Sequence, residues 1–221
     1  MDIRAQRTVA AMHRAILALA EQEDVQDLPV AKVAGEAGIN RVTFYNHAAN
    51  PCELLLAALR PELDQIRAQF LAEAAARPQG PGGMIVDRAV AEHLVARRMV
   101  YRRNLPANGH GFLADFLSDH FAESVRIFLA ARHGSMPGGP DDSSRPKALM
   151  DAVTAQFLAH GATGAIAVWL HTPDPLEPGQ LSGLLRDLMP HWWTQEVPDS
   201  LPEIHQRNHP ASRPAVQAGQ P

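Results

Sequence analysis

The chain has few of the residues that mark disulfide-stabilised, secreted or membrane-spanning proteins. Among its 221 residues there is one cysteine, Cys52, which excludes an intramolecular disulfide and suits a reducing compartment. No signal-peptide pattern is present, and the most apolar run, Ala162–Leu170, is too short to cross a bilayer. We therefore expect a cytoplasmic protein that does not span a membrane.

Sequence signatures of enzymes and metal proteins are missing as well. There is no Walker loop, no dinucleotide-binding glycine pattern and no GxSxG nucleophile elbow. The 11 histidines lack the HExxH spacing and fall on different predicted elements. We therefore expect no catalytic activity, no metal and no cofactor. A helical-bundle enzyme or metal protein is the least favoured alternative.

Positive charge is not in excess either. The formal net charge is −4, and the first 60 residues contain 6 Lys and Arg against 7 Asp and Glu. Nucleic acid would therefore not be attracted by the chain as a whole, and any DNA binding must rest on locally placed side chains. The acidic residues of this part gather in the loop after the first predicted helix, at Glu21, Glu23, Asp24 and Asp27.

The residues that are abundant indicate an all-α protein. Hydrophobic residues make up 46% of the sequence, and no stretch alternates apolar and polar residues as a half-buried strand does. A helix from Pro51 should be interrupted by Pro61, which has no amide hydrogen to donate. Other long helices are expected over 3–21, 84–103, 112–133, 147–170 and 179–193. The predicted parts are a three-helix domain (1–50), a larger helical domain (51–195) and a polar, proline-rich disordered tail (196–221).

The segment from Val30 to Leu55 has the layout of a helix-turn-helix followed by a third, capped helix. Apolar residues recur at helical spacing in its first part, and Gly38 follows where a helix end requires positive φ. Asn40 is a suitable N-cap for a second helix, Arg41–His47. In a helix-turn-helix the second helix enters the DNA major groove.

The predicted recognition helix is rich in side chains that form hydrogen bonds. Tyr45 and His47 favour phosphate contact, while Arg41 and Asn46 have the geometry to contact guanine or adenine edges. Thr43 suits either role, and Phe44 should pack in the core of the small domain. The predicted DNA-binding residues are Arg41, Thr43, Tyr45, Asn46 and His47.

These residues resemble the DNA-binding domain of the tetracycline-repressor (TetR) family of transcriptional regulators. The likeness rests on a preceding helix at Arg4–Glu21, on the triplet Thr43-Phe44-Tyr45, and on the helix start Asn50-Pro51-Cys52-Glu53. It covers about the first 60 residues closely and the remainder in general layout. The resemblance implies a homodimeric, ligand-responsive regulator, most often a repressor, that binds double-stranded DNA at a palindromic operator.

Two positions depart from the family pattern. Ala48 stands where an aromatic residue is usual, and Pro51 and Cys52 stand where a lysine often meets a phosphate. Both departures should weaken non-specific phosphate binding. The alternative function is therefore a helical module of the same fold that binds a small molecule or partner and has lost DNA binding.

The last two predicted helices combine small and large residues on one face. Small residues let helices approach closely, while leucine and tryptophan supply buried area. The pattern fits either a monomer core or a four-helix homodimer interface, and the resemblance favours the interface. A dimer also has a physical reason, because one helix-turn-helix contacts too few base pairs to be selective. The predicted interface residues are Gly161, Gly164, Val168, Leu181, Leu185, Leu188 and Trp192.

An effector pocket is expected between the fourth helix and the middle helices. Its predicted lining is Met99, Phe116, Phe121 and Phe157, and such an apolar lining suits a hydrophobic or aromatic small molecule. Each of these residues also fits an ordinary core. Cys52 fits either an ordinary helix start or a redox-active thiol whose pKa the helix dipole lowers.

Overall fold

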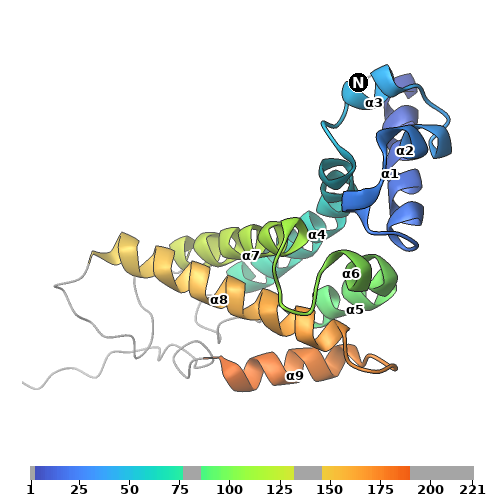
Figure 1. Cartoon of the computed structure of the whole chain (residues 1–221). Helices are drawn as coiled ribbons and strands as arrows, with labels where there is room; N and C mark the ends of the chain where they lie inside the picture. The colour runs from blue at the N-terminus through green and yellow to red at the C-terminus, as the bar shows by residue number, and fades with distance from the viewer. Residues whose placement is uncertain (1–2, 77–85, 132–145, 190–221) are drawn as a thin grey trace, which may run out of the picture.

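The computed structural model describes residues 3–76, 86–131 and 146–189. Across these ranges the regular structure is helical throughout and contains no strand, which confirms the prediction of an all-α protein. The helices form a small N-terminal head and a larger body, joined by the long helix α4 (Figure 1). The elements are α1 (Ile3–Ala20), η1 (Val25–Asp27), α2 (Val30–Glu36), α3 (Arg41–Tyr45), α4 (Pro51–Ala76), α5 (Arg88–Ala96), α6 (Arg98–Asn104), α7 (Phe112–Ala131), α8 (Lys147–Leu170) and α9 (Pro178–Leu188).

The head consists of α1, η1, α2, α3 and the start of α4, packed around one apolar core. Met12 and Ile16 of α1, Val33 of α2 and Phe44 of α3 are all fully buried in it. Because Phe44 is the one buried residue of α3, the rest of that short helix remains at the surface. The core therefore fixes the position of α3 and leaves most of its side chains free for contact.

The turn between α2 and α3 has the geometry that its sequence predicts. Gly38 has a φ of 67°, in the left-handed region that favours glycine. The Ile39 amide donates to the Ala34 carbonyl at 2.9 Å and the Gly38 amide to the Gly35 carbonyl at 3.1 Å, which is the Schellman ending of a helix. Asn40 then caps α3, since its Oδ1 accepts from the Thr43 amide at 2.8 Å.

Helix α4 begins at the predicted cap but does not stop at the predicted proline. Asn50 Oδ1 accepts from the Glu53 amide at 2.9 Å, and Glu53 accepts in return from the Ala49 amide at 2.8 Å. The helix then continues through Pro61 to Ala76, so the prediction that Pro61 interrupts it was wrong. A proline inside a helix costs about 3 kcal/mol, and burial of the neighbouring Leu59 and Leu63 offsets this cost.

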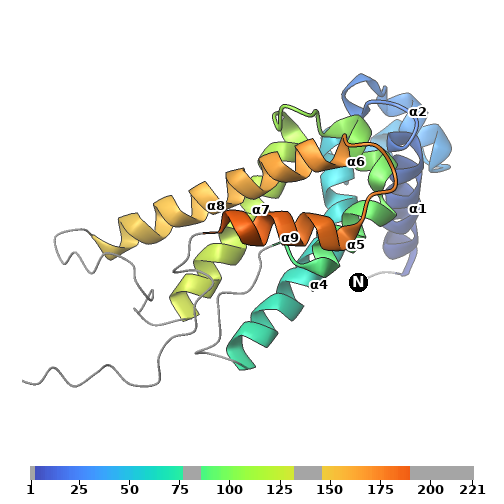
Figure 2. The same cartoon turned by 90° about the horizontal axis from the view of Figure 1, so that it is seen from below.

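The body surrounds the lower half of α4. Helices α7 and α8 run side by side as a long pair, and α5 and α9 pack against each other below α4 (Figures 1 and 2). The predicted helix over 84–103 is two helices, α5 and α6, which meet at Arg97; residues 84 and 85 lie outside the described ranges. Neither glycine nor proline marks this break. The Arg97 guanidinium instead binds the Glu62 carboxylate of α4, so a tertiary contact stabilises the bend.

Helix α6 connects the head to the far end of the body. The buried Asn104 side chain accepts from the Val25 amide of η1 at 2.9 Å and donates to the Ala20 carbonyl at the end of α1 at 3.1 Å. Two residues earlier in α6, Arg102 donates to the Thr172 carbonyl and pairs with Asp174 after α8, both at 2.9 Å. Movement of α6 would therefore be transmitted to both ends.

The C-terminal helices α8 and α9 differ in two respects from the prediction. Helix α8 is long and apolar enough to cross a membrane by length and composition, contrary to the prediction from the shorter run Ala162–Leu170. However, 56% of its most apolar window is buried inside the protein, and core helices meet the same criterion. The last helix ends at Leu188 where the sequence predicted Trp193; Trp192 and the predicted disordered tail lie outside the described residues.

Candidate DNA-binding and ligand-binding sites

Helix α3 holds three of the five predicted DNA-binding residues, and Asn46 and His47 lie in the turn after it, because the helix ends at Tyr45 and not at the predicted His47. Arg41, Tyr45, Asn46 and His47 are exposed, and Thr43 is half-buried. The Tyr45 ring packs edge-on against the buried Phe44 at 5.7 Å between centroids, which orients it while leaving it 58% exposed. The prediction that Phe44 belongs to the core is confirmed.

The structure adds Val42 to these exposed residues. Its side chain is 71% exposed although it is apolar, and it lies between Arg41 and Thr43 on α3. An exposed β-branched residue in such a place can contact the methyl group of thymine. Val42 interrupts a run of polar residues in the predicted helix, and the sequence analysis did not use this as a sign of DNA contact.

The acidic loop of the head lies away from α3, as its position in the sequence suggested. The Glu21 carbonyl accepts from Arg103 of α6 at 3.3 Å, and Val25 is bound by Asn104, so the loop is attached to the body. Glu23 is paired with Lys32. The acidic loop between α1 and α2 therefore lies on the body side of the head, away from α3 (Figure 1).

The two departures from the TetR pattern have different consequences in the structure. Ala48 is 4% exposed and packs in the head core, so its small size removes no donor from the surface. Cys52 is half-buried, and burial together with the nearby Asp24 carboxylate raises the pKa of its thiol. The suggestion that the helix dipole lowers this pKa was wrong, because desolvation outweighs it.

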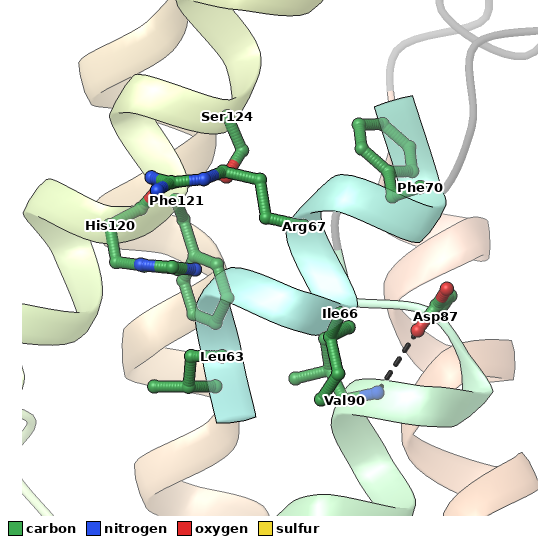
Figure 3. Close-up of a pocket in the computed structure, with 9 residues that line it drawn as sticks. All are labelled: Leu63, Ile66, Arg67, Phe70, Asp87, Val90, His120, Phe121 and Ser124. Atoms are coloured by element: carbon green, nitrogen blue, oxygen red, sulfur yellow. Dashed lines mark hydrogen bonds between the residues drawn. The ribbon is translucent and has the colours of Figure 1, made fainter. Parts of the chain in front are cut away.

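A small, partly open hollow lies where α4, α5 and α7 meet, in the region where a pocket was predicted. Its free volume is about 10 Å³, room for one water molecule. Helix α4 and α7 supply most of its wall, and α5 closes the third side (Figure 3). The lining residues are Leu63, Ile66, Arg67, Phe70, Asp87, Val90, His120, Phe121 and Ser124.

Of the four residues predicted to line a pocket, Phe121 alone does so. Phe116 is buried beside it, under the Arg60 guanidinium at 4.9 Å from the ring centroid. Met99 is 42% exposed and Phe157 is 72% exposed, so the prediction placed both on the wrong surface. Helical periodicity identifies an apolar position without showing whether the inner or outer face of the body receives it.

The polar groups of the hollow come from α4, from α7 and from Asp87, the N-cap of α5. Arg67 pairs with Asp64 at 2.6 Å, and Ser124 donates to the His120 carbonyl at 2.9 Å. The His120 side chain is 3% exposed, and its Nδ1 has no hydrogen-bond partner within the described protein. Burial, followed by the nearby Arg67, lowers the pKa of this histidine to about 4, so its ring is neutral at pH 7.

An open groove adjoins the hollow on the α4–α5 side, with a volume of about 370 Å³. His93 lies at its base, where Nδ1 is 3.0 Å from Glu62 and Nε2 is 2.8 Å from the Tyr101 hydroxyl. Burial lowers the pKa of His93, and the bond from Arg97 lowers the pKa of Glu62. Because a carboxylate only accepts, the neutral ring donates from Nδ1 to Glu62 and accepts from Tyr101 at Nε2.

An apolar stripe runs along the outer face of α8 and continues on α9. Val168 and Leu188, two of the predicted interface residues, belong to it and are 62% and 73% exposed. The stripe comprises Leu149, Val153, Phe157 and Val168 of α8 with Leu184 and Leu188 of α9. We call these six residues the α8–α9 stripe.

Four of the other predicted interface residues lie elsewhere or contribute no side chain. Leu181 and Leu185 are 1% and 2% exposed and belong to the protomer's own core, so their assignment to a dimer interface was wrong. The α9 face that they occupy packs against α5. Gly164 lies against the loop before α7, where a Cβ on Gly109 would be 3.4 Å from its Cα, while Gly161 is exposed.

Within the described ranges, no three His, Cys, Asp or Glu side chains gather in a way that could hold a metal ion.

No family model matches the sequence. No curated protein matches it either. Among solved structures, a TetR transcriptional regulator from Rhodococcus sp. RHA1 matches over 82% of this chain and 93% of its own, with 18% identity and a TM-score of 0.53. The chain has the fold of a TetR regulator. At this identity the likeness establishes the fold and leaves the function to be argued from the sites.

Two further structures resemble the TetR-like chain over most of their length. The multidrug-binding protein EbrR, complexed with malachite green, matches over 86% of this chain and 99% of its own, with 23% identity and a TM-score of 0.49. A TetR family member from Streptomyces coelicolor A3 matches over 86% of this chain and 99% of its own, with 22% identity and a TM-score of 0.48.

Proposed function

We propose that the chain is a ligand-responsive transcriptional regulator of the TetR type that binds DNA through α3. The observation that carries the proposal is the side-chain distribution of this helix. One residue, Phe44, anchors it in the core, while Arg41 and Tyr45 of the helix and Asn46 and His47 directly after it are exposed. A structural hairpin has no need of four polar or aromatic donors on one exposed turn, whereas a recognition helix does.

We propose further that the regulator acts as a homodimer through the α8–α9 stripe. Six large apolar side chains aligned on two adjacent helices, each at least half exposed, form the kind of surface that a soluble monomer rarely retains. A second copy would cover it by the same surface in two-fold symmetry. The two heads of such a dimer would contact the two halves of a palindromic operator.

Repression and effector response complete the proposal. The first turns of helix α4 pack in the head, and its later residues Leu63 and Arg67 line the hollow. A molecule that enters between α4, α5 and α7 would displace α4 and with it the head. Because half-sites are spaced by about one DNA turn, a shift of a few ångströms would spoil simultaneous docking. A hydrophobic or aromatic effector would therefore release the protein from its operator. We place this regulation in the cytoplasm, where the protein meets the DNA.

The test is binding of the full-length protein to DNA from upstream of its own gene, by fluorescence anisotropy at several salt concentrations. Tyr45→Ala and His47→Ala should weaken binding to operator and to unrelated DNA alike, because both side chains are assigned to phosphates. The salt slope should flatten by up to about one unit for each lost ionic contact. Arg88→Ala, which changes an exposed arginine of α5, is the matched control.

An effect of Tyr45→Ala confined to one operator base pair would contradict its assignment to the backbone. If the unaltered protein shows no salt-dependent binding to this DNA, the alternative holds, and the chain is a ligand- or partner-binding module that retains the fold. The negative net charge of −4 is the observation that favours the alternative.

A further inference from the structure

Two buried side-chain polar atoms of the described residues have no hydrogen-bond partner, Trp169 Nε1 and His120 Nδ1, and the second of these lines the hollow. The His120 imidazole extends from α7 toward α4, with the Arg67 side chain passing over it and Leu63 below (Figure 3). Its Nδ1 is buried without a hydrogen bond, and the nearest carboxylate oxygen, on Asp64, is 3.7 Å away, beyond hydrogen-bonding distance. A buried polar atom in this condition costs free energy that a suitable partner would recover.

The charged side chains around the hollow already have partners. The Arg67 guanidinium is paired with Asp64 at 2.6 Å, and Asp87 caps α5 by accepting from the Val90 amide at 3.0 Å (Figure 3). An anion entering here would have to displace Asp64 from Arg67 and approach Asp87, and a cation would be repelled by the Arg67 guanidinium in the wall. An uncharged group is therefore the one that this site can accept without loss.

The remaining wall is apolar and partly aromatic. Leu63, Val90 and Phe121 are buried in it, and Phe70, stacked on Phe128 at 5.7 Å between ring centroids, lies at the rim. These side chains match a flat, apolar body with the polar group at one end. A hydroxyl group is suited to this end, because it can donate or accept and so fits His120 whichever ring nitrogen carries the proton.

The half-buried Ile66 gives the site a way to enlarge. Its side chain borders both this hollow and the more open α4–α5 groove of about 370 Å³. This groove is within the range of small-molecule sites, about 300–1,000 Å³. Rotation of Ile66 would join the two spaces, so that a molecule could enter from the groove and place its hydroxyl against His120.

We propose that this hollow is the binding site for a small uncharged molecule with an aromatic body and one hydroxyl group, a phenol in its simplest form, whose hydroxyl hydrogen-bonds to His120 Nδ1. The proposal deepens the proposed function and rests on it, since it assigns the chemical class of the effector. His120 is the residue that distinguishes the hydroxylated molecule from its hydrocarbon counterpart.

The experiment measures the affinity of the full-length protein for phenol, toluene and benzoate by isothermal titration calorimetry. Phenol should bind about tenfold more tightly than toluene, as expected when a buried unpaired group gains a partner. Benzoate should bind most weakly, because Asp64 and Asp87 oppose a carboxylate. No DNA is present, so the outcome does not depend on whether the protein binds an operator.

Two variants and one spectrum locate the site. In His120→Phe the affinities for phenol and toluene should agree to within about threefold, whereas His160→Phe, a change of an exposed histidine on α8, should keep the tenfold preference. In the unaltered protein, phenol but not toluene should shift the imidazole nitrogen signals of His120 in a 15N spectrum, which keeps the test valid if His120→Phe does not fold. Tightest binding by benzoate, a phenol preference that survives in His120→Phe, an unchanged His120 spectrum, or no binding of phenol would each overturn the proposal.

Discussion

Replacing Asn104 by alanine should destabilise the protein more than any other single polar truncation at the surface between head and body. Asn104 is 2% exposed, and its amide group satisfies the Val25 amide at 2.9 Å and the Ala20 carbonyl at 3.1 Å. Its third bond, to the Val100 carbonyl at 2.8 Å, lies within α6. Truncation of the Asn104 side chain therefore leaves the buried Val25 amide and Ala20 carbonyl without these hydrogen bonds.

The expected loss follows from those two groups. A buried donor or acceptor that loses its partner costs about 1–3 kcal/mol, so the free energy of unfolding should fall by about 2–5 kcal/mol. For a protein of this size, each kcal/mol lowers the melting temperature by about 2–4 °C. We therefore expect Asn104→Ala to melt about 5–15 °C below the unaltered protein when measured by circular dichroism at equal protein concentration.

Asn108→Ala provides the matched control. Asn108 is exposed in the loop after α6, where its side chain accepts from the His110 amide at 3.2 Å. Truncation there should change stability by no more than about 0.5 kcal/mol. If Asn104→Ala melts at the same temperature as Asn108→Ala, the junction does not depend on this amide and the reasoning from unsatisfied groups is refuted.

Three further predictions concern pH, the linker helix and assembly. Burial lowers the pKa of His120 to about 4, so the unfolded chain binds a proton between about pH 6.5 and 4 that the folded protein does not, and stability falls as the pH falls through that window. His120→Asn should reduce this loss by about 3 kcal/mol in urea titrations at pH 7 and 4, and an identical pH dependence would contradict the burial. Pro61→Ala should restore a helical hydrogen bond in α4 and change the effector response more than operator affinity without effector; equal responses would exclude Pro61 as a hinge. Leu188→Arg should sediment as a monomer because it places an unpaired charge in the α8–α9 stripe, while Ile127→Arg on α7 should not alter the sedimentation; a dimer in both would rule out the stripe as the interface.

Local sequence rules account for the head almost completely. Gly38 has the positive φ that the turn requires, Asn40 and Asn50 cap the helices that they were predicted to cap, and Phe44 is buried. Each of these features depends on residues within about one helical turn of each other. The exposure of Tyr45 and His47 follows from the same local pattern.

The body depends on contacts that no local pattern contains. The break at Arg97 follows from its bond to Glu62, 35 residues earlier, and the continuation of α4 through Pro61 follows from the burial of the leucines around it. Periodicity marked Phe121 and Phe157 equally as apolar, yet one is 2% and the other 72% exposed. A hydrophobic stripe indicates that a helix face is covered, and does not indicate what covers it.

The sequence by itself therefore determined the helical class, the helix-turn-helix and the exposure of Arg41, Tyr45 and His47, because short-range hydrogen bonds and helical periodicity decide them. The tertiary structure alone decided which faces of α8 and α9 point outward, where Leu181 and Leu185 are buried, and that His120 lacks a partner beside Arg67. Those outcomes depend on how helices distant in sequence pack against each other. Burial and charge balance at such contacts are sums over several helices, and no single segment of the chain encodes them.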